Sequence, residues 1–64
     1  MVDVDELRGI IAKQKKSQLD VAKHIGVSPK TFYLKMQKRV FGSDEIEKMI
    51  DYLNINDLSI FFGH

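Results

Sequence analysis

Apolar residues recur along the chain at helical spacing, in segments separated by residues that typically begin or end helices. Asp3 and Glu6 form a capping-box pattern at the start of a helix predicted over about residues 4–15. Three apolar residues fall on one face of this helix: Val4, Leu7 and Ile11. No segment alternates regularly between apolar and polar residues, so we expect an all-α chain of five short helices.

The second predicted helix covers about residues 18–25. Ser17 is a suitable N-cap, and Asp20 lies close to the positive end of the helix dipole. Gly26 can end the helix in the left-handed conformation, which glycine adopts at little cost. Its expected buried face consists of Val21, Ala22 and Ile25.

The third predicted helix covers about residues 29–38. Ser28 caps it, and Pro29 occupies the first turn, where a missing amide hydrogen costs nothing. Phe32 and Met36 form its only apolar pair at i, i+4 spacing. The rest of this helix is mostly polar or basic and is therefore expected to face solvent.

The last third of the chain predicts two more helices. Ser43 is expected to cap the fourth, and Asn54 to end it. Its apolar stripe is Ile46, Met49, Ile50 and Leu53. Asn56 is expected to cap a short fifth helix, which carries Leu58, Phe61 and Phe62, with Ile55 and Ile60 placed as a hydrophobic staple.

Charge is distributed unevenly along the chain. The net charge is only +1, but residues 8–40 hold nine basic residues against Asp20 alone, and acidic residues dominate both ends. Because the local field attracts a polyanion more than the net charge does, this basic middle favours nucleic-acid binding.

Several classes of function have little support in the composition. The chain has no cysteine, its apolar runs reach three residues where a membrane span needs about 20, and its first residues are acidic, unlike a signal peptide. His24 and His64 each lack a second ligand at metal-site spacing, and no glycine-rich phosphate loop occurs. We expect one domain over residues 1–64, cytoplasmic, with no enzymatic activity, cofactor, metal, small-molecule ligand or membrane partner.

Residues 18–36 combine the features of a helix-turn-helix corner. Ala22 is small where two helices would touch, and Gly26 permits the turn. Four apolar residues would lock the corner: Val21, Ile25, Val27 and Phe32. The second helix of such a pair presents its polar side to a DNA major groove.

The pattern Gln18…Val21-Ala22…Ile25-Gly26-Val27-Ser28…Thr31-Phe32 resembles the core signature of the Cro/C1-type, lambda-repressor-like family of phage and mobile-element repressors. Residues 43–54 also resemble the following helix of small phage-type members, so the likeness covers residues 4–62. It implies a compact five-helix domain that binds double-stranded operator DNA as a repressor-like transcriptional regulator. It also implies a homodimer, at least on DNA.

The resemblance assigns roles to individual residues. Gln18 would contact a phosphate, and the family's base-facing positions fall on Pro29, Lys30, Leu34 and Gln37. Pro29 and Leu34 depart from the usual polar residues, so readout would rest mainly on Lys30, Thr31, Tyr33 and Gln37. Thr31 and Tyr33 have an alternative role, in which they reach phosphates instead of bases. Leu34 would support it by packing against a thymine methyl group. Further candidates for phosphate contacts are Ser17, Lys35, Lys38 and Arg39.

Some positions allow two interpretations. Four lysines form either a phosphate-facing stripe, which we favour, or an ordinary solvated surface: Lys13, Lys15, Lys16 and Lys23. Tyr33 either contacts DNA or is half-buried against the fourth helix, and Leu34 becomes a core residue if the third helix is rotated. At Phe61 and Phe62, either one side chain is buried and the other exposed, or the two residues form a homodimer contact.

A rival function is a protein-interaction module or anti-repressor that uses Leu34 and the Phe61–Phe62 end.

Overall fold

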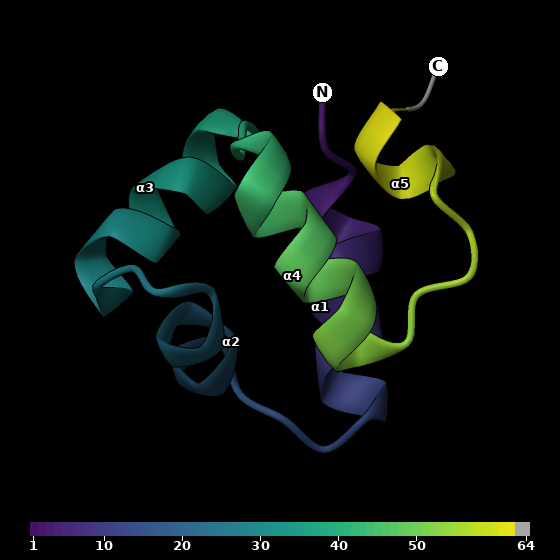
Figure 1. Cartoon of the computed structure of the whole chain (residues 1–64), viewed down its shortest axis with the longest axis horizontal. Helices are drawn as coiled ribbons and strands as arrows, with labels where there is room; N and C mark the ends of the chain where they lie inside the picture. Colours follow the sequence, from purple (N-terminus) through teal and green to yellow (C-terminus); the bar gives the residue numbers. More distant parts are fainter. Residues whose placement is uncertain (63–64) are drawn as a thin grey trace.

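The computed structural model describes residues 1–62 and contains five helices (Figure 1). They are α1 (Val4–Lys13), α2 (Gln18–Ile25), α3 (Pro29–Lys38), α4 (Ser43–Leu53) and α5 (Ser59–Phe62). The described residues contain no strand, so the all-α prediction is confirmed. The Cα radius of gyration is 10.4 Å, close to the value of about 10.7 Å expected for a compact chain of this length. None of these helices is both long and apolar enough to cross a membrane.

Each helix buries the face that its apolar spacing predicts. The buried residues form one core cluster to which all five helices contribute. Helix α2 packs against both α3 and α4, and α1 packs against α5. In α4 the stripe is buried except for Ile50, which is only partly buried. The predicted buried faces that are confirmed are Val4, Leu7 and Ile11 in α1; Val21, Ala22 and Ile25 in α2; Phe32 and Met36 in α3; and Ile46, Met49 and Leu53 in α4.

The caps of α2 and α3 form as predicted. The Asp20 amide donates to Ser17 Oγ at 3.1 Å, and the Ser17 amide donates to the Asp20 carboxylate at 2.9 Å. Gly26 ends α2 in the left-handed region, with φ at 83°. At the start of α3 the Thr31 amide donates to Ser28 Oγ at 3.1 Å. These local bonds fix where both helices of the predicted corner begin.

Helix α1 differs from its prediction at both ends. It stops at Lys13 because Lys15 turns into the left-handed region and its amide donates to the carbonyl of Ala12. At the start, the Glu6 amide donates to the Asp3 carboxylate at 3.1 Å, as a capping box requires. The Asp3 amide donates instead to the carbonyl of Ile60 at 2.6 Å, so only half of the predicted box forms.

The predicted caps of α4 and α5 are wrong. Gly42, not Ser43, is the N-cap of α4, and its amide donates to the Glu45 carboxylate at 2.7 Å. Helix α5 begins only at Ser59, whose amide donates to the Asp57 carboxylate at 3.0 Å, so Asn56 lies three residues before the helix and does not cap it. Leu58 was expected on this helix but precedes it, and it is 44% exposed. The prediction that Asn54 ends α4 is confirmed by its left-handed conformation.

The first residues of the chain join two distant segments. The Val2 amide donates to the carbonyl of Arg39 at 3.0 Å, just after α3, while Asp3 bonds to α5. Val2 and Phe41 are both buried, although the apolar pattern did not place either in the core. The N-terminal segment therefore ties the end of α3 to α5, and both lie at the same end of the molecule (Figure 1).

Candidate nucleic-acid interface

Helices α2 and α3 meet at a corner made by residues 26–28. The Val27 amide donates to the carbonyl of Ala22 at 3.0 Å, which closes the end of α2. Ala22 is fully buried where α2 packs against its neighbours, and Phe32 anchors α3 in the same core. Val27 is partly buried against this core. Each residue type that the sequence placed at the corner has the expected burial or conformation.

Helix α3 packs against the core with one face. Phe32 and Met36 are buried, and Leu34 lies two residues from each of them. At about 100° per residue, Leu34 therefore points almost directly away from the core. Three exposed polar residues surround it at helical spacings of three and four: Lys30, Gln37 and Lys38. We call these four residues the α3 outer face; α3 lies at the edge of the molecule in Figure 1.

The structure excludes the buried alternatives for Tyr33 and Leu34. Tyr33 is 67% exposed, so it is not half-buried against α4. Leu34 is 46% exposed, so α3 is not rotated to bring it into the core. Tyr33 borders a shallow recess that it shares with Gln18, Leu19 and Pro29. The start of α2 and the first turns of α3 thus form one continuous surface.

The candidate phosphate contacts lie at two places around α3. Ser17 and Gln18 lie at the start of α2; Ser17 is exposed, and Gln18 is partly buried with a buried Oε1 that accepts no hydrogen bond among the described residues. Lys38 is exposed and Arg39 partly exposed at the end of α3. Thr31 is exposed in the first turn, where its hydroxyl bonds to Ser28 Oγ at 2.9 Å.

Lys35 is placed differently from the other α3 lysines. Its Nζ lies 3.1 Å from the Glu45 carboxylate on α4, and the two side chains are 31% and 18% exposed. Burial acts to raise the pKa of Glu45, but the hydrogen bond from Gly42 and the ion pair with Lys35 outweigh it and lower that pKa. Lys35 therefore joins α3 to α4 and does not belong to the α3 outer face.

One acidic group lies beside the candidate surface. Hydrogen bonds from the backbone and the side chain of Ser17 lower the pKa of the Asp20 carboxyl, so Asp20 is ionised at neutral pH. Asp20 compensates the positive end of α2. Its charge also offsets part of the attraction that nearby cations exert on a phosphate.

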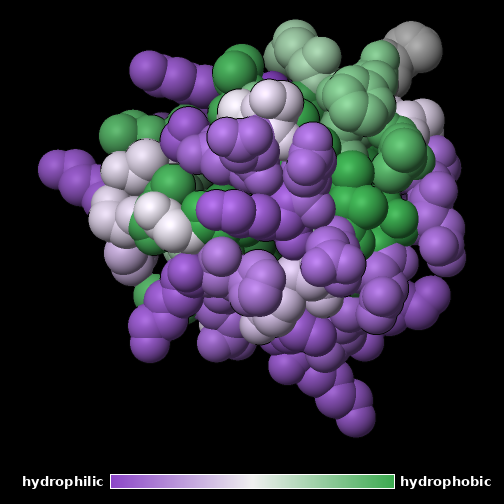
Figure 2. Space-filling view, in the orientation of Figure 1, coloured by the Kyte–Doolittle hydropathy of each residue, from purple (hydrophilic) through white to green (hydrophobic). Residues whose placement is uncertain are grey.

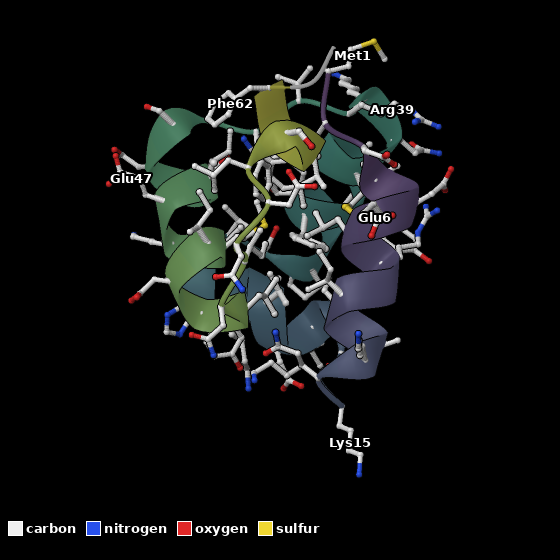
Figure 3. All side chains as sticks on the ribbon, turned by 90° about the vertical axis from the view of Figure 1, so that its right-hand side faces the viewer. Met1, Glu6, Lys15, Arg39, Glu47 and Phe62 are labelled. Carbon is white, nitrogen blue, oxygen red and sulfur yellow. The ribbon has the colours of Figure 1, made fainter. Side chains whose placement is uncertain are left out.

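The structure places two of the four lysines outside α3 that were candidates for a phosphate-facing stripe, Lys15 and Lys16. Lys15 and Arg39 lie at opposite ends of the molecule (Figure 3). Lys16 Nζ stands 4.9 Å from the centre of the Tyr52 ring on α4. His24 stacks on the same ring, with centroids 4.0 Å apart and planes 13° apart. Lys16 and His24 thus contribute to the joint between α2 and α4, an arrangement that local sequence patterns do not reveal.

Metal-ligating groups do not cluster in the part of the chain that the structure describes. Within residues 1–62, no three histidine, cysteine, aspartate or glutamate side chains come together in a way that could hold a metal ion. His64 lies outside the described residues.

No protein-family model, curated protein or solved structure matches the chain. The resemblance to the Cro/C1-type family therefore rests on the quoted residues alone. The function has to be inferred from the surface that α2 and α3 present.

Proposed function

We propose that the chain is a sequence-specific DNA-binding transcriptional regulator of the repressor type, which inserts α3 into the major groove of operator DNA. The observation that carries the proposal is the α3 outer face, an exposed, largely polar and basic surface on the side of the helix opposite to the buried Phe32 and Met36. A helix is about as wide as the major groove, so a helix exposed in this way can enter it.

Lys30 and Gln37 are the principal base-reading residues of the proposal. Lysine donates hydrogen bonds to O6 and N7 of guanine, and glutamine pairs with N6 and N7 of adenine. Both residues are exposed on the same side of α3. They are seven residues apart, which is about 10 Å along a helix. A helix lying along the groove would therefore read about three base pairs between them.

Phosphate contacts would supply most of the affinity. Ser17 and Gln18 can bond to the backbone at the start of α2, and Lys38 and Arg39 can do so at the end of α3. Thr31 and Tyr33, both exposed near the start of α3, can reach the flanking backbone. Lys35 is left out because Glu45 neutralises it.

A second copy of the chain would complete the operator complex. One α3 spans too few base pairs to define a unique site, whereas a two-fold pair reads two half-sites. Phe62 is 68% exposed, while Phe61 is buried. Figure 2 shows apolar surface beside α5, next to a largely hydrophilic surface over α4. We place the homodimer contact at Phe62 and the exposed Leu58.

The rival function is a protein-interaction module. It is favoured by the exposure of Tyr33, Leu34 and Phe62, since exposed apolar side chains are common at protein interfaces. Salt separates the two functions: phosphate binding weakens steeply with added salt, and an apolar interface does not.

The test is selection of bound duplexes from a random DNA pool, followed by fluorescence anisotropy at about 50 and 200 mM salt. Only cationic contacts release counterions, so the two phosphate contacts of Lys38 and Arg39 would weaken binding about ten-fold per copy over this range. Replacing Lys30 and Gln37 together by Ala should remove the sequence preference while the domain stays folded. Lys48→Ala, which removes one exposed charge from α4, is the matched control and should change little. Unchanged sequence preference in the double variant would show that α3 is not the reading helix.

A further inference from the structure

Leu34 is an unusual residue for the centre of a polar reading surface. It is nearly half exposed, and it is not among the partly buried apolar residues that pack against the core. Its neighbours at helical spacing are Lys30, Gln37 and Lys38. A single exposed leucine is ordinary on a protein surface. This one points away from Phe32 and Met36, the two buried residues of α3, on the side that would face a duplex in the proposed complex.

The chemistry around Leu34 indicates what it can contact. Two lysines beside it favour a polyanion and disfavour an extended apolar partner. Within the major groove, the only apolar group on a base edge of unmodified DNA is the C5 methyl group of thymine. Tyr33, the nearest exposed aromatic residue in the sequence, borders one recess at the start of α2 and another that it shares with Arg8 and Gln37; Leu34 lines neither of them.

We propose that Leu34 makes the chain selective for a 5-methylpyrimidine in the major groove. This inference rests on the proposed DNA-binding function and adds a specificity-determining residue to it. Leu34 lies four residues after Lys30 and three before Gln37, which places it about 6 Å and 4.5 Å along the helix from them. The methyl group therefore belongs to a base pair between the two pairs that Lys30 and Gln37 read.

The same contact makes binding responsive to cytosine methylation. 5-Methylcytosine carries its methyl group at the same ring position as thymine, but it presents a different hydrogen-bonding group beside it. Because Leu34 forms no hydrogen bonds through its side chain, it senses the methyl group and not the neighbouring base edge. An unmethylated cytosine at this position should bind more weakly than 5-methylcytosine.

The experiment replaces each thymine of the selected duplex, one at a time, by deoxyuridine, which lacks only the methyl group. For the wild-type chain, one position per half-site should weaken binding about four-fold, the ratio that corresponds to burying one methyl group. For Leu34→Ala the same replacement should have no effect, since the partner of the methyl group is gone. Val40→Ala trims an exposed apolar side chain that lies outside the proposed contacts and should retain the four-fold dependence.

Each outcome bears on a different claim. If the wild-type chain binds its duplex but tolerates deoxyuridine at every position, the methyl contact is refuted and the DNA-binding function stands. If Leu34→Ala keeps the four-fold dependence, or Val40→Ala loses it, Leu34 is not the residue that senses the methyl group. If no duplex is enriched, or if binding is insensitive to salt, the DNA-binding function itself is refuted together with the methyl contact.

Discussion

Replacing Glu45 by Gln should loosen the attachment of α3 to α4 without changing the shape of the side chain. The Glu45 carboxylate accepts the Gly42 amide at 2.7 Å and pairs with Lys35 Nζ at 3.1 Å. Gln can keep a neutral hydrogen bond from Gly42 but cannot pair with a cation. A charged hydrogen bond contributes about 1 kcal/mol more than a neutral one, and a partly exposed ion pair adds less than about 1 kcal/mol. We therefore expect a loss of about 1–2 kcal/mol in the free energy of unfolding.

The pH dependence identifies the source of this loss. The pKa of Glu45 is lowered in the folded chain, so its stabilisation is present above the pKa of the unfolded state and is lost as the pH falls through the folded value. The difference between wild type and Glu45→Gln should be largest near pH 7 and should vanish near pH 2, where both side chains are neutral.

Urea denaturation followed by circular dichroism at both pH values measures the difference. Thermal unfolding should show a decrease in Tm of roughly 7–15 °C at pH 7, given the small size of the domain. Glu47→Gln is the matched control, since Glu47 lies on the same helix and is exposed; its effect should stay below about 0.5 kcal/mol. An equal loss for Glu45→Gln at both pH values, or an equal loss in the control, would refute the assigned role of Glu45.

Three further substitutions test other parts of the account. Ser17→Ala removes the cap of α2 and should lower the free energy of unfolding by about 1 kcal/mol in urea denaturation; no change would mean that the capping box is not formed in solution. Gly26→Ala should cost about 1 kcal/mol in the same assay, because φ is 83° there although no neighbouring atom lies within 4 Å of the added Cβ. Phe62→Glu should weaken self-association in sedimentation on operator DNA and leave the unfolding curve nearly unchanged; unaltered association would place the dimer contact elsewhere.

Local features of the chain were predictable because they depend on residues close together in sequence. The period of the apolar residues correctly identified the buried faces of α1 to α4. The N-caps Ser17 and Ser28 were correct because each faces its partner amide within three residues. The exposed position of Leu34 follows from the same helical period, because the buried Phe32 and Met36 lie two residues before and two residues after it.

Where two local signals competed, the sequence did not decide between them. Ser43 is the better intrinsic N-cap, but Glu45 reaches back to the Gly42 amide while it also pairs with Lys35, so α4 begins one residue earlier than a serine cap would allow. The second half of the capping box at Asp3 does not form for a related reason. Its amide is taken by the carbonyl of Ile60, a partner almost the whole chain away.

Contacts between helices could not be predicted from the pattern. The stack of His24 on Tyr52 and the pair between Lys35 and Glu45 depend on which helices meet and at what rotation. For this reason the sequence predicted a phosphate contact for both Lys35 and Lys38. In the structure Lys35 pairs with Glu45 on α4, whereas Lys38 is exposed.

The central claim is that the outer face of α3 reads DNA, and amide chemical-shift mapping by NMR tests it most directly. The isotopically labelled chain would be titrated with its selected duplex and, separately, with a scrambled duplex of equal length. We predict that the largest sequence-dependent shifts fall on residues 29–38 and at the start of α2, and that the outer surface of α4 changes little. Shifts that concentrate on α4 or are the same for both duplexes would contradict the claim.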